Sequence, residues 1–228
     1  MWKELISTIY QKVKQPLKPW LEWVQAPPLC EQLELLWDSE ILKTGEVLEW
    51  RLSDPHLVTE MERIEHDAYQ GVTMWRGIDF YEDMVYNARS FYLQGLIDEE
   101  LIAFVGVRRD AKDVHISNFV VRPDWQSVGI GSSVLHQLQE LLPDLERDTL
   151  TLEVRESNVR AQRFYQRHGF VVERLEKNYY ANNHENAYWM TYQSPDVPVT
   201  LMDTDAALGQ KNRLRIRKKN ENDHNFSY

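Results

Sequence analysis

The sequence predicts an α/β protein in which a mixed β-sheet carries helices on both faces. From residue 47 onward, short runs rich in β-branched and aromatic residues alternate with segments of helical periodicity. The expected order is β-α-α-β-β-β-α-β-α-β-β, and an acidic turn at 98–100 joins two of the strands as a hairpin. Elements in this order bury their apolar surfaces best as one mixed sheet with helices on each side.

The first half of this region contains two strands that form a hairpin and two helices that precede it. Residues 47–52 have the composition of a strand, and Asp54 with Pro55 is typical of a helix N-terminus. The helix that follows is expected to end near Gly71, where the apolar stripe stops. A second helix is expected over 79–88, and the hairpin strands over 91–97 and 101–107.

The second half alternates strands and helices whose ends are marked by proline or glycine. Pro123 stops one strand, Pro143 ends a helix, and Gly169 ends another in the left-handed conformation that glycine favours. The expected strands are 113–121, 149–155, 170–174 and 187–192, and the expected helices are 130–142 and 159–168. Residues 177–186 are expected to link the last two strands.

Composition indicates a soluble globular protein. The chain has 228 residues, of which 43% are hydrophobic and 27% charged, and a formal net charge of -10, which argues against wholesale nucleic-acid binding. An acidic surface would suit a basic partner such as a positively charged peptide. Cys30 is the single cysteine, so no internal disulfide can form, and we expect a reducing, cytoplasmic location. We expect neither a membrane span nor a signal peptide, because no apolar run approaches about 20 residues.

Three parts are expected: a Trp-rich helical N-terminal extension (1–45), a central α/β domain (46–193) and a basic, disordered C-terminal tail (194–228). Apolar residues recur at helical spacing near the N-terminus, which fits a helix packed on the domain or a docking arm for a partner or membrane surface. The tail has six Lys and Arg between 211 and 219 and little to bury. It fits either a solvated tail or a contact with RNA or a ribosomal surface.

A glycine loop at 126–131 joins a strand to a helix. The first backbone N–H groups of a helix have no partner and lie at the positive end of the helix dipole, so such a loop can hold a phosphate. Gly129 and Gly131 would let the backbone approach the ligand without a Cβ. The loop fits neither a P-loop nor a dinucleotide fingerprint, because the Lys-Ser/Thr and the third glycine are missing.

Two polar side chains follow the loop at positions suited to acid–base chemistry. In the 149–155 strand, Glu153 points away from the apolar side chains of alternate positions. In the next helix, Tyr165 shares a face with Asn158, Ala161 and Gln162. Taken alone, Glu153 also fits a surface carboxylate and Tyr165 a ring in the core.

Together these motifs resemble the GCN5-related N-acetyltransferase (GNAT) superfamily, and within it the bacterial ribosomal-protein-alanine N-acetyltransferases. The resemblance covers about residues 47–190 and excludes the first 45 residues and the tail. The matching motifs are Asn118-Phe-Val-Val-Arg-Pro-Asp124, Gln126-Ser-Val-Gly-Ile-Gly131, Leu152-Glu-Val-Arg-Glu-Ser-Asn158, Phe164-Tyr165, Gly169-Phe170 and Asn178-Tyr-Tyr180, with weaker matches at Ile64-Glu65, Trp75 and Glu185-Asn-Ala187.

The resemblance implies a GNAT fold, with a mostly antiparallel sheet and two splayed parallel strands that hold acetyl-CoA as co-substrate. It implies Glu153 as general base and Tyr165 as general acid in a direct ternary-complex transfer to an amine. Trp75 and Tyr180 are implied to bind the acceptor. The residues implied to bind acetyl-CoA are Phe119, Val120, Val121, Gln126, Ser127, Val128, Gly129, Ile130, Gly131, Ser132 and Asn158.

The expected acceptor is the N-terminal α-amine of a ribosomal-protein-like peptide. An α-amine has a pKa of roughly 7.7 to 8.0, against about 10.4 for lysine, so a modest base deprotonates it more easily. The alternatives are an acetyltransferase for a polyamine or aminoglycoside, and a non-catalytic acyl-CoA-binding docking module. Val128 and Asn186 depart from the family pattern in the loop and the acceptor site. No metal is expected, since the histidines lack ligand spacing.

Overall fold

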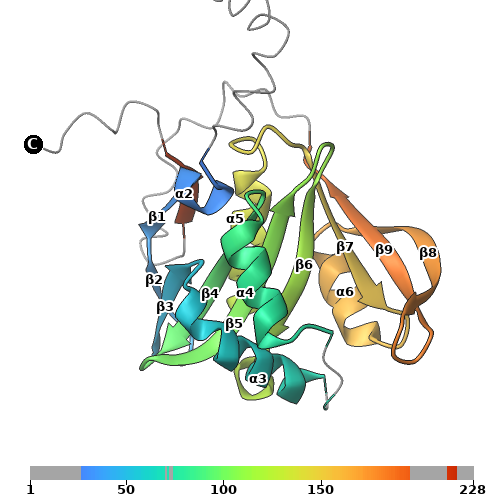
Figure 1. Ribbon diagram of the computed structural model, residues 1–228, viewed down its shortest axis with the longest axis horizontal. Helices are drawn as coiled ribbons and strands as arrows, with labels where there is room; N and C mark the ends of the chain where they lie inside the picture. Colours follow the sequence, from blue (N-terminus) through green and yellow to red (C-terminus); the bar gives the residue numbers. More distant parts are fainter. Residues whose placement is uncertain (1–26, 70, 72–73, 196–214, 220–228) are drawn as a thin grey trace, which may run out of the picture.

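The computed structural model describes residues 27–69, 71, 74–195 and 215–219. The main sheet has eight strands, in the order β2-β3-β4-β5-β6-β7-β9-β8 (Figure 1). Every neighbouring pair is antiparallel except β6 and β7, which are parallel. The strands are β2 (Ser39–Ile41), β3 (Val47–Leu52), β4 (Ser90–Ile97), β5 (Glu100–Arg109), β6 (Val114–Val121), β7 (Thr149–Arg155), β8 (Val171–Tyr180) and β9 (Glu185–Gln193). The expected mixed, mostly antiparallel sheet is confirmed.

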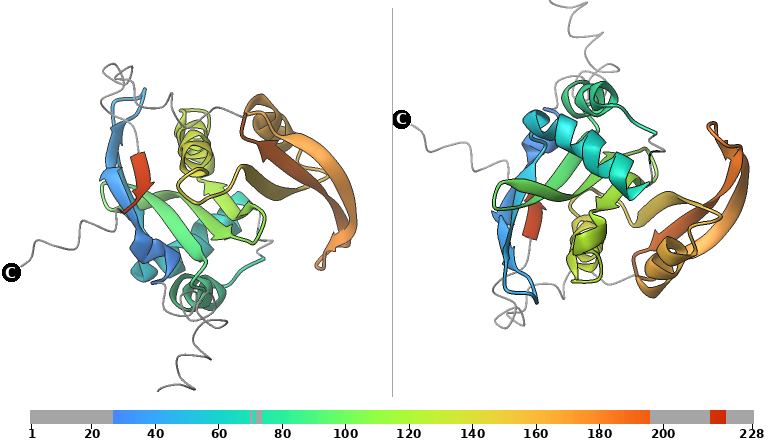
Figure 2. Two further views of the ribbon diagram at one scale, coloured as in Figure 1. Left: turned by 90° about the horizontal axis from the view of Figure 1, so that it is seen from above. Right: turned by 90° about the horizontal axis from the view of Figure 1, so that it is seen from below.

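Helices cover both faces of this sheet, as the order of elements predicted. One face carries α3 (Val58–Ala68) and α4 (Gly77–Tyr86), and the other carries α5 (Ile130–Leu141) and α6 (Val159–Arg167), as Figure 2 shows. Two short 3-10 turns, η1 (Pro55–Leu57) and η2 (Pro123–Trp125), precede α3 and α5. The Asp54 carboxylate accepts a hydrogen bond from the backbone N–H of His56 at 2.9 Å, so it caps this helix start as expected.

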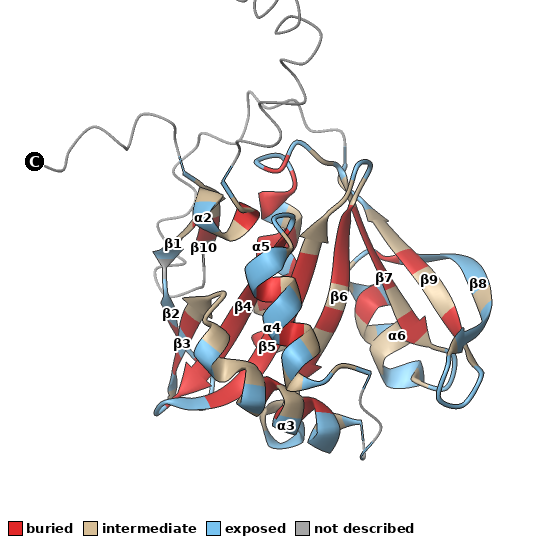
Figure 3. Ribbon diagram, in the orientation of Figure 1, coloured by how far each residue is buried: buried red, intermediate tan, exposed pale blue. Residues whose placement is uncertain are grey.

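The core lies on both sides of the central strands, whose buried residues are red in Figure 3. Every residue of β4 is buried, and β5 is buried from Leu101 to Val107. One apolar cluster lies under α3 and α4 around Phe80 and Phe104, and a larger one lies under α5 and α6. Strands that are covered on both faces are apolar at consecutive positions, which explains why the hairpin was readable from sequence.

The parallel pair opens into a gap. Strands β6 and β7 pair only where Val114–Ile116 faces Leu150–Leu152. Beyond this point β6 stays with β5 as far as Val121, while β7 stays with β9 as far as Arg155. Figure 1 shows the two strands meeting at one end and diverging toward the other. The gap therefore opens at their carboxyl ends, where parallel strands usually present ligand sites.

The segments flanking the domain differ from the expectation. Residues 29–41, expected in a helical extension, form a one-turn helix α2 (Leu29–Gln32) and strands β1 (Leu33–Trp37) and β2. Within the tail expected to be disordered, β10 (Arg215–Lys218) pairs antiparallel with β1. The side chain of Ile216 is 5% exposed and joins the larger core cluster. A single isoleucine between basic residues does not predict a strand. Ile216 is buried only because β10 pairs with β1, which lies about 180 residues earlier in the chain.

Other expectations for these flanking segments lie outside the described residues. The apolar stripe and Trp cluster of 1–26 and the last residues, 220–228, are among them. No helix in the described part of the chain is long and apolar enough to cross a membrane.

Strand β8 is longer than predicted. It runs to Tyr180 instead of ending at residue 174, so Tyr180 lies on the strand rather than in a linking loop. The strand is the edge of the sheet and is mostly exposed, and its pairing with β9 shifts register between Val172 and Arg174 and again between Glu176 and Tyr180. An exposed strand with bulges has no regular alternation of apolar residues, so its length could not be predicted.

Candidate active site

The glycine loop lies between β6 and α5, and Gly129 forms the N-cap of the helix. Its φ angle is +113°, and a Cβ added there would have no atom within 4 Å, so the backbone is open to a ligand. Gly131 also has a packing role. A Cβ at Gly131 would lie 3.1 Å from the ring of Phe164, so this glycine allows α5 to pack closely against α6.

Two side chains connect the loop to its surroundings. Gln126 Nε2 donates to the backbone oxygen of Val121 at 2.9 Å, which ties the loop to the end of β6. Arg160, in the first turn of α6, donates from Nη2 to Ser127 Oγ at 3.2 Å. The loop lacks a basic residue at Val128, and the fold supplies a guanidinium from α6 instead. Arg160 could not be identified from the sequence, because it lies 33 positions from Ser127.

The last residues of β6, expected to contact the cofactor, lie beyond the part paired with β7. The ring of Phe119 packs edge-on against Phe164, with centroids 6.3 Å apart, and Val120 is 2% exposed in the cluster under α3 and α4. Their side chains are therefore anchored, while their backbone borders the gap. Backbone donors at this position suit an extended ligand lying between the strands.

Asn158 forms the N-cap of α6. Its Oδ1 accepts a hydrogen bond from the backbone N–H of Ala161 at 3.1 Å, so the side-chain oxygen is already engaged. The expected contact with acetyl-CoA would therefore use Nδ2. Gln162, which was expected on the same face, donates to the backbone oxygens of Arg155 and Glu156 and holds the turn before the helix.

Glu153 is not the surface carboxylate that a strand glutamate usually is. Its side chain is 12% exposed, and Oε2 lies 3.0 Å from Nε2 of His115 on the neighbouring strand. The hydroxyl of Tyr179, on β8, interacts with the same carboxylate. Burial first, and then the negative charge of Glu153, raises the pKa of Tyr179. Glu153 is thus held in a partly enclosed, polar site that faces α3 and β8.

Tyr165 presents a hydroxyl without a hydrogen-bond partner among the described residues. Its ring packs on Phe164 and Phe170, with centroids at 5.3 and 5.6 Å. Burial raises its pKa above the usual range, with smaller contributions from the hydroxyls of Tyr69 and Tyr180. The hydroxyl therefore stays protonated at neutral pH and is free to donate.

Tyr180 lies across the opening from Tyr165. The guanidinium carbon of Arg155 lies 3.7 Å from the centre of its ring, and Arg155 Nη1 also bonds Glu185 Oε2 at 2.9 Å. Burial raises the pKa of Tyr180, and Arg155 opposes that shift; Glu153 contributes as well. Tyr180 thus interacts with both Glu153, the expected general base, and Tyr165, the expected general acid.

Trp75 and Glu65 border the site from the helical layer. The ring of Trp75 packs on Phe80, with centroids 5.3 Å apart, and its backbone N–H donates to Glu65. Glu65 is 3% exposed, and its Oε2 has no hydrogen-bond partner among the described residues. Burial raises the pKa of Glu65 to about 7; the bond from Trp75 lowers it and Glu62 raises it further. Asn118 Oδ1 is a second buried acceptor without a donor there.

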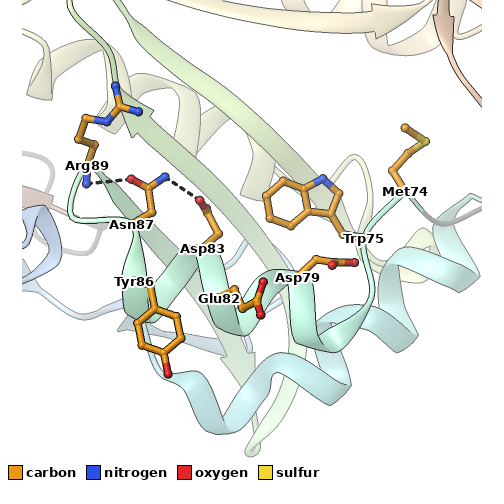
Figure 4. Close-up of a pocket in the computed structure, with 8 residues that line it drawn as sticks. All are labelled: Met74, Trp75, Asp79, Glu82, Asp83, Tyr86, Asn87 and Arg89. Carbon is orange, nitrogen blue, oxygen red and sulfur yellow. Dashed lines mark hydrogen bonds between the residues drawn. The ribbon is translucent and has the colours of Figure 1, made fainter.

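An open acidic groove begins at Trp75 and runs along α4 (Figure 4). Its volume is about 650 Å³. Asp83 is held in place there by hydrogen bonds from Asn87, Ser90 and Tyr92. The sequence offered no signal for this groove, because its carboxylates converge through the placement of α4. The lining residues are Met74, Trp75, Asp79, Glu82, Asp83, Tyr86, Asn87 and Arg89.

The residues that the structure describes contain no cluster of three or more His, Cys, Asp or Glu that could hold a metal ion.

Comparison with known proteins adds independent information. Residues 48–170 match the model of the acetyltransferase (GNAT) family. A Bacillus subtilis protein is 30% identical to this chain over 137 residues, which is 58% of this chain and 91% of that protein. It is named provisionally as a ribosomal protein bS18-alanine N-acetyltransferase. The ribosomal protein bS18-alanine N-acetyltransferase of Salmonella typhimurium is 35% identical over 95 residues, or 41% of this chain and 64% of that protein.

Solved structures share the fold. The ribosomal-protein-S18-alanine N-acetyltransferase of Escherichia coli superposes with a TM-score of 0.56 at 24% identity, over 68% of this chain and 98% of that one. NAA60 of Arabidopsis thaliana in complex with acetyl-CoA superposes with a TM-score of 0.56 at 18% identity, over 64% of this chain and 98% of that one.

Proposed function

The chain belongs to the acetyltransferase (GNAT) family and is an N-acetyltransferase, and we propose that its acceptor is the α-amine at the N-terminus of a protein. The proposed substrate is a ribosomal-protein-like peptide, and acetyl-CoA is the donor. The observation that supports the proposal is the interaction of Tyr180 with both Glu153 and Tyr165; Glu153 lies on β7 just beyond the part of that strand that pairs with β6. The relatives named for ribosomal-protein alanine acetylation support the choice of acceptor.

Acetyl-CoA would lie between β6 and β7, where it supplies an acetyl thioester. The backbone of 119–121 would bond its extended arm, and the loop around Gly129 would receive the pyrophosphate at the N-terminus of α5. Arg160 would add a positive charge at that loop. The open space over Gly129 and the gap between the strands fit such a ligand.

In the proposed reaction Glu153 receives a proton from the acceptor ammonium. The neutral amine then attacks the thioester carbonyl directly, and backbone donors of β6 stabilise the oxyanion. Tyr165 donates its proton to the departing thiolate. Its buried hydroxyl suits this task, because the raised pKa keeps it protonated until the thiolate forms.

Two features of the structure are compatible with a peptide acceptor. Glu65 and Asn118 have buried acceptor oxygens that lack donors among the described residues, and the N–H groups of a peptide N-terminus would supply donors. The acidic groove along α4 offers a place for basic residues that follow the N-terminus. We also propose a cytoplasmic location, which suits a chain whose single cysteine is Cys30.

The test combines the purified protein, acetyl-CoA and short peptides that differ in their first residues. Each peptide is made with and without an internal lysine, and polyamines are tested in parallel. Thiol release gives the rate, and mass spectrometry locates the acetyl group. We expect acetylation of the α-amine, above all of an N-terminal Ala or Ser. Turnover with polyamines alone would contradict the peptide proposal.

Substitutions test the two proposed catalytic residues. Glu153→Gln and Tyr165→Phe keep the shape of each side chain, and each is expected to lower kcat by about 10² or more while acetyl-CoA binding persists. Glu173→Gln on β8 and Tyr192→Phe on β9 are matched controls that lie outside the site and should retain activity. Unchanged rates in both test variants would refute the roles given to these residues.

A further inference from the structure

Glu153 is the first member of a chain of four side chains whose polar atoms lie within 3.0 Å of one another in turn. Its Oε2 lies 3.0 Å from His115 Nε2, and His115 Nδ1 lies 2.9 Å from Thr151 Oγ1. Thr151 Oγ1 in turn donates to Asp113 Oδ2 at 2.6 Å. His115 and Thr151 face each other in the last paired stretch of β6 and β7, just before the strands diverge.

Counting protons along this chain defines the state of the imidazole. An ionised carboxylate accepts only, so the single hydroxyl proton of Thr151 is used by Asp113. Thr151 Oγ1 must then accept from His115, which places a proton on Nδ1. A neutral His115 in this tautomer turns the lone pair of Nε2 toward the carboxylate of Glu153. Two acceptors that face each other at 3.0 Å, with no proton between them, are placed to bind one proton jointly.

The surroundings isolate this pair from solvent and fix the ring. His115 is 6% exposed, and its ring stacks on Trp189 with centroids 5.4 Å apart and planes 24° apart. Two cations lie around it. Arg108, opposite His115 on β5, bonds Asp110 and also interacts with the charge of Glu153, and Arg174 on β8 lies over the ring of Trp189. The other neighbours that bear on the pair are the Asp110 carboxylate, which interacts with His115, and the Tyr179 hydroxyl on Glu153.

We propose that the general base of this enzyme is the Glu153–His115 pair, with Thr151 and Asp113 as positioning residues that set the imidazole tautomer. The inference rests on the proposed role of Glu153. During transfer an N–H bond of the acceptor ammonium breaks, and the proton is bound between Glu153 Oε2 and His115 Nε2. The proton bound by the pair leaves to water after the product departs, and it is the one proton that the overall reaction releases. Tyr165 gives its own proton to the thiolate and regains one from the attacking nitrogen, whose second N–H bond breaks as the amide forms.

This arrangement makes one directional prediction for three positions. When the imidazole of His115, the hydroxyl of Thr151 or the carboxylate of Asp113 is removed, Glu153 faces a hydrogen-bond donor or has no partner. Its carboxylate then binds a proton less tightly. His115→Gln, Thr151→Val and Asp113→Asn should each move the acid limb of the kcat–pH profile to lower pH, by about one unit. Each should also lower the plateau kcat about 10-fold, because a weaker base transfers the proton less readily.

The experiment measures kcat between pH 5 and 9 with a saturating peptide acceptor and acetyl-CoA. Thr151→Ser keeps the hydroxyl and should restore the parent profile. Thr149→Val is the matched control, because Thr149 lies on the same strand and bonds Asp148 at 2.7 Å, outside the chain. It should keep the parent rate and profile. Urea unfolding of each variant reports loss of structure separately from loss of rate.

The outcomes separate this inference from the proposed function. If Glu153→Gln lowers kcat but the other three variants keep the parent acid limb, Glu153 acts alone and the pair is refuted. A lower kcat with an unmoved acid limb in Thr151→Val would likewise show a merely structural role. If Glu153→Gln itself keeps its rate, the assignment of Glu153 as base is the part that fails.

Discussion

Two buried carboxylates in the site, Glu65 and Glu153, differ in what surrounds them. Glu153 faces a histidine and a tyrosine, each of which can share or donate a proton. Glu65 accepts the backbone N–H of Trp75, with no positive group beside it in the part of the chain that the structure describes, and burial raises its pKa to about 7. The chemistry of each side chain is therefore set by its neighbours and not by its type.

Glu65 is expected to make stability depend on pH. A folded pKa of about 7, above the reference value of 4.5, means that the folded state binds more protons than the unfolded state between these values. Its stabilising contribution is present below pH 4.5 and is lost as pH rises through 7. The difference of about two and a half pKa units between the folded and unfolded states corresponds to about 3 kcal/mol of stability.

Glu65→Gln should remove this dependence, since the amide stays neutral and can still accept from Trp75. At pH 8 the variant should be more stable than the parent by up to about 3 kcal/mol, and at pH 4 nearly equal. Urea unfolding at several pH values measures this difference, and Glu60→Gln on the same helix serves as the control. A parent whose stability is flat between pH 4 and 8 would contradict the prediction.

At the scale of elements, the first turn of α6 serves two ends of the site. Asn158 caps the helix and Arg160 reaches the glycine loop, while Tyr165 lies two turns further along. One helix thus connects the proposed cofactor loop to the proposed general acid. Both the dipole of α6 and the guanidinium of Arg160 favour an anionic ligand at the exposed N-terminus of this helix.

Arg160→Gln should weaken acetyl-CoA binding about 5- to 10-fold, the effect of about 1 to 1.4 kcal/mol from one charged contact. Calorimetry with acetyl-CoA at low and high salt measures it, and the loss should shrink at high salt because salt screens exposed charges. Arg163→Gln, one turn along α6 and exposed, is the control. Equal affinity for both variants would place Arg160 outside the binding site.

Strand β10 should stabilise the domain although it lies far along the chain. Ile216 is buried, its backbone N–H donates to Gln137 Oε1 at 3.3 Å, and Arg217 pairs with Glu34. Ile216→Ala should lower the free energy of unfolding by about 2 to 4 kcal/mol. Truncation after residue 214 should destabilise by a similar amount or more, and truncation after 219 much less. Equal thermal midpoints for the two truncations would show that β10 contributes nothing.

At the scale of the whole molecule, the sheet is two units that meet at one short parallel ladder. Strands β2 to β6 carry α3 and α4, and β7 to β9 include the β8–β9 hairpin with Tyr180. The three paired positions at 114–116 and 150–152 and the core shared under α5 and α6 join the two units, and the gap beyond the ladder is the proposed site. A ligand placed there contacts both units, so its binding should tighten the molecule as a whole.

Acetyl-CoA should therefore slow amide hydrogen exchange in residues 117–121 of β6, whose side toward β7 is unpaired. Residues 114–116 are already paired with β7 and should change little. Saturating acetyl-CoA should also raise the free energy of unfolding by about 2.7 kcal/mol at one hundred times Kd. Exchange followed by mass spectrometry checks the pattern, and protection confined to other strands would rule out this binding mode.

Much of the fold was predictable because its central elements are strongly patterned. The bounds of β3 and β7 agree with prediction, and the Asp54 cap and the strand–loop–helix at Gly129 were readable locally. Glu153 and Tyr165, the proposed acid–base residues, were predicted from spacing and resemblance. His115, Arg160 and the groove of α4 were not, since each acts through a partner on another element.

The sequence by itself determined the order of elements and the glycine loop, because these depend on periodicity and on neighbours within a few positions. Its resemblance to a known family led to Glu153 and Tyr165 as the proposed acid–base residues. The tertiary structure alone decided where β6 and β7 separate, that β10 completes a sheet with β1, and that His115, Thr151 and Asp113 line up behind Glu153. Those features depend on pairing between distant strands, and the free energy of such pairing comes from contacts that no local pattern records.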